Sequence, residues 1–136
     1  MDNCVIKRSN HILNDTGSLF VFEGKENIPF VVKRIYYITN VKDREAIRGN
    51  HAHKALHQIM VCLGGSCEIL LDDGKNREIV QLDDPGKILY IMPCVWREIS
   101  KFSEGSTLMV LASEEYDEAD YIRNYKDFRD YVRGLK

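Results

Sequence analysis

The stretch Arg48-Gly49-Asn50-His51-Ala52-His53-Lys54 lies where strand-like sequence resumes after a polar loop. Alternate residues of a strand point to the same side, so His51 and His53 are expected to project together into the space that the sheet encloses. Histidine both coordinates metals and titrates near neutral pH, and two neighbouring imidazoles therefore indicate metal binding or proton transfer. A bare His-x-His also fits a surface or packed pair, so the surrounding sequence has to decide.

Length and charge exclude several classes of protein. A chain of 136 residues with 44% hydrophobic side chains fits one domain, residues 1–136. The net charge of -2 and the pI of about 6.1 argue against a nucleic-acid surface, which is normally basic. The start of the chain lacks the apolar core of a signal peptide, and no apolar run approaches the ~20 residues of a membrane span. We therefore expect a cytoplasmic protein that binds neither nucleic acid nor membrane.

Short β-branched and aromatic runs recur between turn sequences along most of the chain. Their regular spacing is typical of an antiparallel sandwich or barrel. Turn residues at 72–75 predict a hairpin over residues 67–82. The four cysteines form no Cys-x-x-Cys pair, and we predict that they are reduced and structural. The predicted strands span residues 18–22, 30–39, 57–63, 67–71, 78–82, 88–91 and 107–112.

After Ala112 the apolar residues change to helical spacing. Tyr121, Tyr125, Phe128 and Val132 would form one stripe on a helix. Acidic residues crowd the beginning of this segment and basic residues its end, which is the order that a helix dipole favours. We expect a carboxyl-terminal helix that packs on the sheet, since packing explains the stripe better than nucleobase stacking does.

A small all-β domain with an inward His-x-His resembles a cupin, which is a jelly-roll barrel. The first cupin motif carries His-x-His, three spacers, Glu, six spacers and Gly, and His51, His53, His57 and Gly64 keep this spacing with His in place of Glu. In the second motif, Arg97 stands near the place of the usual metal-binding histidine. A permanent guanidinium opposes a divalent cation and favours an anion or a carbonyl oxygen. The resemblance implies an all-β fold, a cupin jelly-roll barrel with a C-terminal α-helix.

Nearly the entire chain is similar to the nucleotide-sugar 3,4-ketoisomerases, cupins that act on dTDP-4-keto-6-deoxyglucose. This resemblance implies a cytoplasmic homodimer without metal or other cofactor, in which the dTDP-linked 4-keto-6-deoxy sugar lies inside each barrel. Its amino-terminal strands are candidates for exchange between subunits. The product, a dTDP-3-keto-6-deoxyhexose, would serve the synthesis of 3-amino sugars for surface glycans such as the O-antigen of lipopolysaccharide. The matching stretches are Ile28-Pro29-Phe30 with Lys33-Arg34-Ile35-Tyr36-Tyr37-Ile38, Arg48-Gly49 with His51-Ala52-His53-Lys54, Val61-Cys62-Leu63 with Gly65-Ser66-Cys67, Leu71-Asp72-Asp73-Gly74, Leu89-Tyr90-Ile91 with Pro93 and Trp96, Leu111-Ala112-Ser113, and Tyr116-Asp117-Glu118 with Asp120-Tyr121-Ile122-Arg123.

The implied reaction gives roles to particular residues. In a 4-keto sugar the hydrogen on C3 lies next to the carbonyl, so a modestly basic imidazole can remove it if the enolate is hydrogen-bonded. His51 is the candidate base that carries the proton from C3 to C4, and His53 would hold, polarise or relay. Tyr37 is the candidate acid or donor to the sugar oxygens. Parity does not decide between Tyr36 and Tyr37, because a bulge would exchange the faces of the strand.

The remaining candidates would bind the substrate. Arg48 would bind the pyrophosphate bidentately, and Arg97, Tyr36 and Thr16 would border the sugar. Many family members have Arg-Gly-Ser-Leu where this chain has Thr16-Gly17-Ser18-Leu19, and Trp-His-Glu where it has Trp96-Arg97-Glu98. Since arginine is a poor acid, this difference bears on which ring face of C4 receives the proton, and we expect the gluco product rather than the galacto epimer.

Two alternatives remain open. A metal-dependent cupin would use His51, His53 and His57 as ligands of iron, manganese or zinc. A non-catalytic sugar-binding cupin would keep the same fold and differ by lacking turnover.

Overall fold

The computed structural model describes residues 1–135, and strands dominate them. A short 3-10 helix, η1 (Glu118–Asp120), precedes the last strand, and helix α1 (Tyr125–Gly134) follows it. The predicted all-β class with a C-terminal helix is confirmed. The strands are β1 (Cys4–Arg8), β2 (Asn10–Asn14), β3 (Gly17–Val21), β4 (Arg34–Thr39), β5 (Arg48–His53), β6 (Gln58–Leu63), β7 (Cys67–Asp72), β8 (Arg77–Leu82), β9 (Lys87–Ile91), β10 (Trp96–Ser100), β11 (Thr107–Ala112) and β12 (Tyr121–Ile122).

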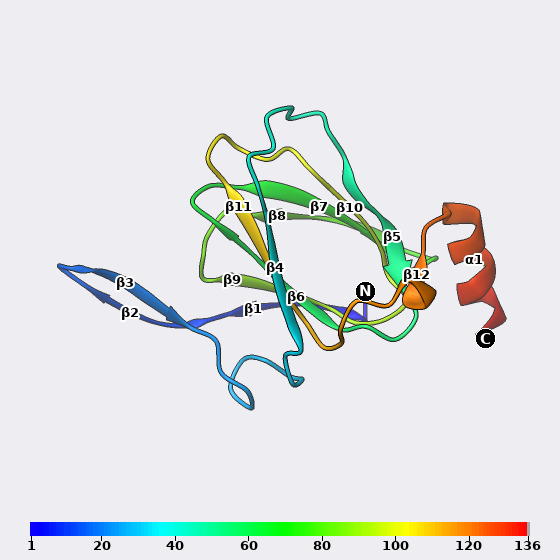
Figure 1. The fold of residues 1–136 in the computed structure, drawn as a ribbon, viewed down its shortest axis with the longest axis horizontal. Helices are drawn as coiled ribbons and strands as arrows, with labels where there is room; N and C mark the ends of the chain where they lie inside the picture. The colour runs from blue at the N-terminus through cyan, green and yellow to red at the C-terminus, as the bar shows by residue number, and fades with distance from the viewer. Residues whose placement is uncertain (136) are drawn as a thin grey trace.

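Two five-stranded sheets face each other as in a jelly roll (Figure 1). One has the strand order β1-β9-β6-β11-β4 and the other the order β12-β5-β10-β7-β8. The strand pairs of both sheets are antiparallel, and β7 pairs with β8 as the predicted hairpin. Within residues 1–135 the two sheets share no strand pairing, so the barrel stays open, and polar cavities lie between β4 and the β5–β12 edge.

Alternation along the strands separates an inner core from an outer one. On β6, Met60 and Cys62 point between the sheets, whereas Ile59 points outward. The same parity turns Tyr36 and Ile38 of β4 inward. The side of each strand that faces the barrel is therefore fixed by its apolar residues, and the polar residues that share this parity must line the interior. The inner cluster also contains Ile69, Leu71, Leu89, Ile91, Ile99, Phe102, Leu108 and Val110.

The helix α1 covers the outer face of the second sheet. Asn124 caps its first turn with a side-chain oxygen, so the helix begins at Tyr125. Phe128 is buried and packs against Trp96, with ring centroids 5.9 Å apart. The predicted helix is confirmed, but Tyr121 does not belong to its stripe, because this residue lies on β12 and pairs with β5.

Strands β2 and β3 form a hairpin that extends away from the barrel, at the end opposite α1 (Figure 1). Its apolar side chains Ile12, Leu13 and Leu19 are exposed. The strands β1, β2, β10 and β12 were not predicted, and the predicted strand over residues 30–39 begins at Arg34. The helices within residues 1–135 are all too short or too polar to span a bilayer.

Candidate active site

A bulge in β5 turns the first histidine into the barrel. In the pairing with β10, His51 lies opposite Arg97 and Gly49 opposite Glu98, so Asn50 is an extra residue. Gly49 has a φ of 88°, and a Cβ at this position would lie 3.1 Å from the Arg97 carbonyl oxygen. Glycine therefore allows β5 to approach β10 closely, and the bulge directs the imidazole of His51 toward the interior.

A chain of hydrogen bonds joins the two histidines to a carboxylate. His51 Nε2 lies 3.1 Å from His53 Nε2, and His53 Nδ1 lies 2.9 Å from Asp120 Oδ2. At one end, Asp120 Oδ1 accepts the Ala55 N–H at 2.7 Å. At the other end, His51 Nδ1 lies 2.9 Å from the carbonyl oxygen of Gly49. The expectation that both imidazoles project to one side is confirmed.

This chain constrains where the ring protons lie. A carbonyl oxygen and an ionised carboxylate can only accept, so Nδ1 of both His51 and His53 must donate. The contact between the two Nε2 atoms then needs one shared proton, which makes three protons on four ring nitrogens. Two neutral imidazoles supply two protons, so the Nε2–Nε2 hydrogen bond forms only when the pair takes up a third, next to the charge of Asp120. The pair can therefore accept and return one exchangeable proton beside the cavity.

Burial disfavours the protonated form of the histidine pair. Desolvation, together with the charge of Arg97, lowers the pKa of His51 to about 4 and lowers the pKa of His53 well below its ordinary value. The ring of Tyr121 covers both imidazoles, with centroids 4.9 Å from His51 and 4.4 Å from His53. At neutral pH the pair therefore releases the extra proton, and His51 Nε2 is left able to accept one.

Arg97 is fully buried on β10, the strand that neighbours β5 in the same sheet. Its guanidinium donates to the carbonyl oxygen of Val95 at 3.1 Å and to Oε1 of Gln58, both of them neutral acceptors. Burial lowers the pKa of Arg97 to about 10, so the side chain is still charged at neutral pH. A buried cation that has neutral partners is poised to bind an oxygen or an anion of a ligand.

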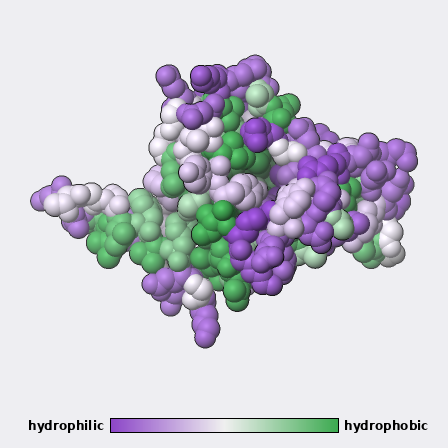
Figure 2. Space-filling view, in the orientation of Figure 1, coloured by the Kyte–Doolittle hydropathy of each residue, from purple (hydrophilic) through white to green (hydrophobic). Residues whose placement is uncertain are grey.

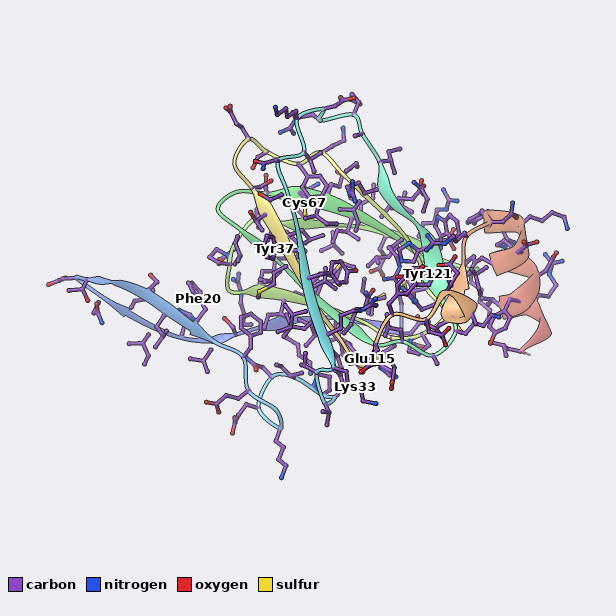
Figure 3. The ribbon with its side chains drawn as sticks, viewed as in Figure 1. Phe20, Lys33, Tyr37, Cys67, Glu115 and Tyr121 are labelled. Carbon is purple, nitrogen blue, oxygen red and sulfur yellow. The ribbon has the colours of Figure 1, made fainter. Side chains whose placement is uncertain are left out.

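The structure decides between the two tyrosines of β4. Tyr36 lines the same cavity as His51, and its hydroxyl accepts a hydrogen bond from Gln58 Nε2 at 3.1 Å. Tyr37 faces outward and is 67% exposed (Figure 3). The predicted residue Tyr37 therefore does not line the cavity of its own barrel. The physical reason is the regular ladder between β4 and β11, which contains no bulge that would exchange the two faces.

The cavity beside the histidines has a volume of about 370 Å³ and a basic border. Arg34, Arg48 and Arg123 line it, and Arg48 is exposed at its edge. Nε of Arg34 is buried and has no hydrogen-bond partner within residues 1–135. A second polar cavity of about 600 Å³ reaches His53 and Asp120. A larger cavity of about 830 Å³ has a mostly apolar lining and lies outside the barrel against β4 and β11, away from the two histidines.

Two predicted residues lie apart from this group. Thr16 is exposed in the turn of the β2–β3 hairpin, where its hydroxyl donates to Asn14 Oδ1 at 2.6 Å. His57 follows the turn that ends β5, and its Nδ1 lies 2.7 Å from Tyr90 Oη, beside Phe30. The three-histidine ligand set is therefore not assembled. Within residues 1–135, no three His, Cys, Asp or Glu side chains gather in a way that could hold a metal ion.

The sequence reasoning missed five residues of the site: Asp120, Tyr121, Arg123, Arg34 and Gln58. Asp120 was read as part of a helix. Arg34 shares its parity with Tyr36 on β4, so an inward Tyr36 would have placed it. Gln58 stands seven residues after His51 at the start of a predicted strand, where a polar side chain before an apolar run was the available signal.

Comparisons with known proteins agree with this geometry. The family model FdtA (WxcM-like, C-terminal) matches residues 2–133. A curated relative, the TDP-4-oxo-6-deoxy-alpha-D-glucose-3,4-oxoisomerase of Aneurinibacillus thermoaerophilus, is 48% identical over 135 residues, which cover 99% of this chain and 96% of the relative.

Two solved structures extend the comparison. A mutant of the 3,4-ketoisomerase QdtA from Thermoanaerobacterium thermosaccharolyticum, in complex with TDP-4-keto-6-deoxyglucose, superposes with a TM-score of 0.95 at 46% identity, over 98% of this chain and 96% of that one. The WlaRB TDP-quinovose 3,4-ketoisomerase from Campylobacter jejuni has a TM-score of 0.90 at 45% identity, over 96% and 99%.

Proposed function

The chain belongs to the FdtA family, and from this premise we propose that it moves the keto group of dTDP-4-keto-6-deoxy-D-glucose from C4 to C3. One observation carries the proposal beyond family membership. His51 and His53 form a hydrogen-bonded pair that borders a basic cavity, and Asp120 accepts a hydrogen bond from His53. A paired base and acid beside a site for an anionic nucleotide sugar is what a proton transfer between adjacent carbons requires.

In the first half of the reaction, Nε2 of His51 removes the proton from C3. The electrons of the C3–H bond form a C3=C4 double bond, and the keto oxygen on C4 becomes an enolate. The guanidinium of Arg97 and the hydroxyl of Tyr36 are the donors that would hydrogen-bond this oxygen as its charge grows. Burial raises the pKa of Tyr36, so the phenol keeps its proton at neutral pH.

In the second half, the proton of the C3 hydroxyl passes to the enolate oxygen on C4, and the negative charge moves to the oxygen on C3. The oxygen on C3 then becomes the new carbonyl, while C4 receives a proton from the imidazolium of His51. The net change moves one proton from C3 to C4 and one from the oxygen on C3 to the oxygen on C4, with no external oxidant or reductant. His53, held by Asp120, would stabilise the imidazolium of His51 between the two halves.

The border of the cavity fits a diphosphate. Arg34 and Arg48 present guanidinium groups that can bind phosphate oxygens bidentately. Arg123 adds positive charge to the border, but its Nε and Nη2 already donate to the carboxylate of Glu118. Arg34 offers a buried Nε that lacks a partner within the described residues, and a ligand oxygen would satisfy it. We assign the nucleotide and its pyrophosphate to this side of the site and the sugar to the part of the cavity beside His51 and Tyr36.

For the configuration at C4, we propose the gluco product. Arg97 stays charged at neutral pH and cannot deliver a proton to C4 as a titrating side chain would. His51 is then the donor from its own side of the ring. The relative named for TDP-quinovose, whose sugar is 6-deoxyglucose, is 45% identical to this chain, against 38% for a relative named for TDP-fucose.

We also propose a homodimer with exchanged hairpins. Ile12, Leu13 and Leu19 expose apolar surface on a hairpin that its own barrel does not cover, and Figure 2 shows apolar surface running from the base of the hairpin over the neighbouring barrel. Exchange would bury this surface and would bring Thr16 to the sugar of the partner barrel. Sedimentation velocity tests the proposal with Leu13→Glu, which should shift the protein to monomers. A monomeric wild type would contradict it.

Two further assignments follow from the same premise. We propose that residues 1–136 work as one cupin-type domain, since the family model spans residues 2–133. We propose a cytoplasmic location, because all four cysteines are unpaired thiols, as a reducing compartment maintains them.

The decisive experiment combines the purified protein with dTDP-4-keto-6-deoxyglucose and a 3-aminotransferase. An amino sugar should form when both proteins are present and in neither single incubation. Proton NMR of the ketoisomerase reaction in deuterated water should show an equatorial hydroxyl on C4. An axial hydroxyl would refute the gluco assignment, and an unchanged 4-keto sugar would refute the isomerase.

A further inference from the structure

Gln58 is a buried polar residue on the inner face of an apolar strand. The next residues with its parity on β6, Met60 and Cys62, belong to the inner hydrophobic core. Its carboxamide is nevertheless satisfied at both ends, because Oε1 accepts from Arg97 Nη1 and Nε2 donates to Tyr36 Oη. A buried amide is costly unless both ends are bonded, so this bridge fixes the orientation of the side chain.

The bridge has a defined direction. A guanidinium has donors and no acceptor, so the amide atom that faces Arg97 must be the carbonyl oxygen. The amide nitrogen then faces Tyr36 and donates to the phenol oxygen. Because that oxygen already accepts from Gln58, its own proton is left for an acceptor in the cavity that Tyr36 shares with His51.

We propose that Gln58 is a positioning residue that commits the Tyr36 hydroxyl to donate to the keto oxygen of the bound sugar. This inference rests on the proposed isomerase function and assigns a residue that acts through Tyr36 without touching the substrate. Because Arg97 can only donate, it fixes the orientation of the Gln58 amide. The amide nitrogen in turn fixes which way the hydroxyl of Tyr36 donates.

Two substitutions of similar size separate polarity from mere packing. Gln58→Glu keeps bonds to both partners, but its carboxylate accepts from Tyr36 and so withdraws the hydroxyl proton from the cavity. Gln58→Met loses both bonds, yet it leaves the proton of Tyr36 free to turn toward the substrate. If Gln58 sets polarity, Glu should lower kcat by about 10²-fold, the loss typical of removing one oxyanion donor, and Met by less than about tenfold. A structural role predicts the opposite order.

The coupling to Tyr36 is tested by a double-mutant cycle. Tyr36→Phe should itself lower kcat by about 10²-fold, and adding Gln58→Glu should cost nothing more, because the two changes remove one interaction. The affinity for dTDP alone should stay within about twofold in every variant. Gln81→Glu makes the same chemical change on exposed β8 and should leave kcat unchanged.

A second readout does not depend on turnover. The protein is labelled with 13C at tyrosine Cζ, and the Tyr36 resonance is assigned by its loss in Tyr36→Phe. This resonance should shift in Gln58→Glu, because the phenol becomes a donor to the carboxylate, and should shift less in Gln58→Met. An unmoved resonance in Gln58→Glu, a larger loss of kcat in Met than in Glu, or multiplicative losses in the double mutant would each overturn the proposal. If the wild type failed to isomerise the sugar, the proposed function would fail, while the resonance of the ligand-free protein would still decide the direction of the bond.

Discussion

Replacing Asp120 by Asn perturbs the site at its far end while preserving its shape. The side chain of His53 is 1% exposed and that of Asp120 17% exposed, and their atoms lie 2.9 Å apart, so solvent screens this contact little. A hydrogen bond to a charged partner in such a setting is worth about 1.5–3 kcal/mol. If the bond strengthens as His51 and His53 take the proton from C3, its loss lowers kcat by about 10- to 150-fold.

The same substitution has a predicted sign on the pH profile. Removing the negative charge destabilises the protonated form of the pair, so the pKa of His51 and His53 falls further below its ordinary range. The acid limb of kcat/KM, along which the base becomes protonated, should therefore move to lower pH. The assay is the rate of dTDP-4-keto-6-deoxyglucose isomerisation by NMR, from pH 9 down to the lowest pH at which each variant stays folded, because the pKa of His51 is about 4. Asp117→Asn is the matched control, since Asp117 is exposed and caps η1, a role that asparagine also fills. Wild-type kcat and an unshifted acid limb in Asp120→Asn would refute the reasoning.

Four further outcomes are expected. His51→Asn should abolish isomerisation and keep dTDP affinity, measured by calorimetry; turnover at the wild-type rate would remove His51 as the base. Tyr36→Phe should lower kcat by about 10²-fold and Tyr37→Phe by less than twofold, and the reverse ranking would contradict the observed faces of β4. Because the folded pKa of His51 is about 4 against an ordinary 6.5, the unfolded chain binds more protons in this window, and acidification through it should cost up to about 3 kcal/mol of unfolding free energy. Urea titrations at pH 7 and pH 4.5 should show a smaller loss for His51→Asn than for the wild type. Phe128→Ala should lower the unfolding free energy by about 3–5 kcal/mol, and a loss below 1 kcal/mol would show that α1 is not part of the cooperative core.

The strands that were predicted from the sequence share an apolar, β-branched pattern. The missed strands either contain a site residue or lie at a sheet edge or in a hairpin. β10 reads Trp-Arg-Glu-Ile-Ser, and its buried Arg97 breaks the alternation that marks a half-buried strand. A charged residue is placed inward because the site needs a cation there, which local propensity does not express. β1 and β2 are edge and hairpin strands whose pairing is decided by distant residues, as in the contact of β1 with β9. Tertiary pairing, and not local preference, formed these elements.

The site followed the same division between local and distant determinants. Spacing alone placed His51 and His53 on one side of β5, because both lie on one strand beyond the bulge. Tyr121 and Asp120 were expected on a helix from their spacing. Because Asn124 caps α1, the helix begins only at Tyr125, and residues 121–122 pair with β5 instead. That pairing brings a carboxylate 67 residues away in sequence against His53. The sequence therefore predicts that His51 and His53 lie together. The contact with Asp120, which affects their pKa, depends on the fold.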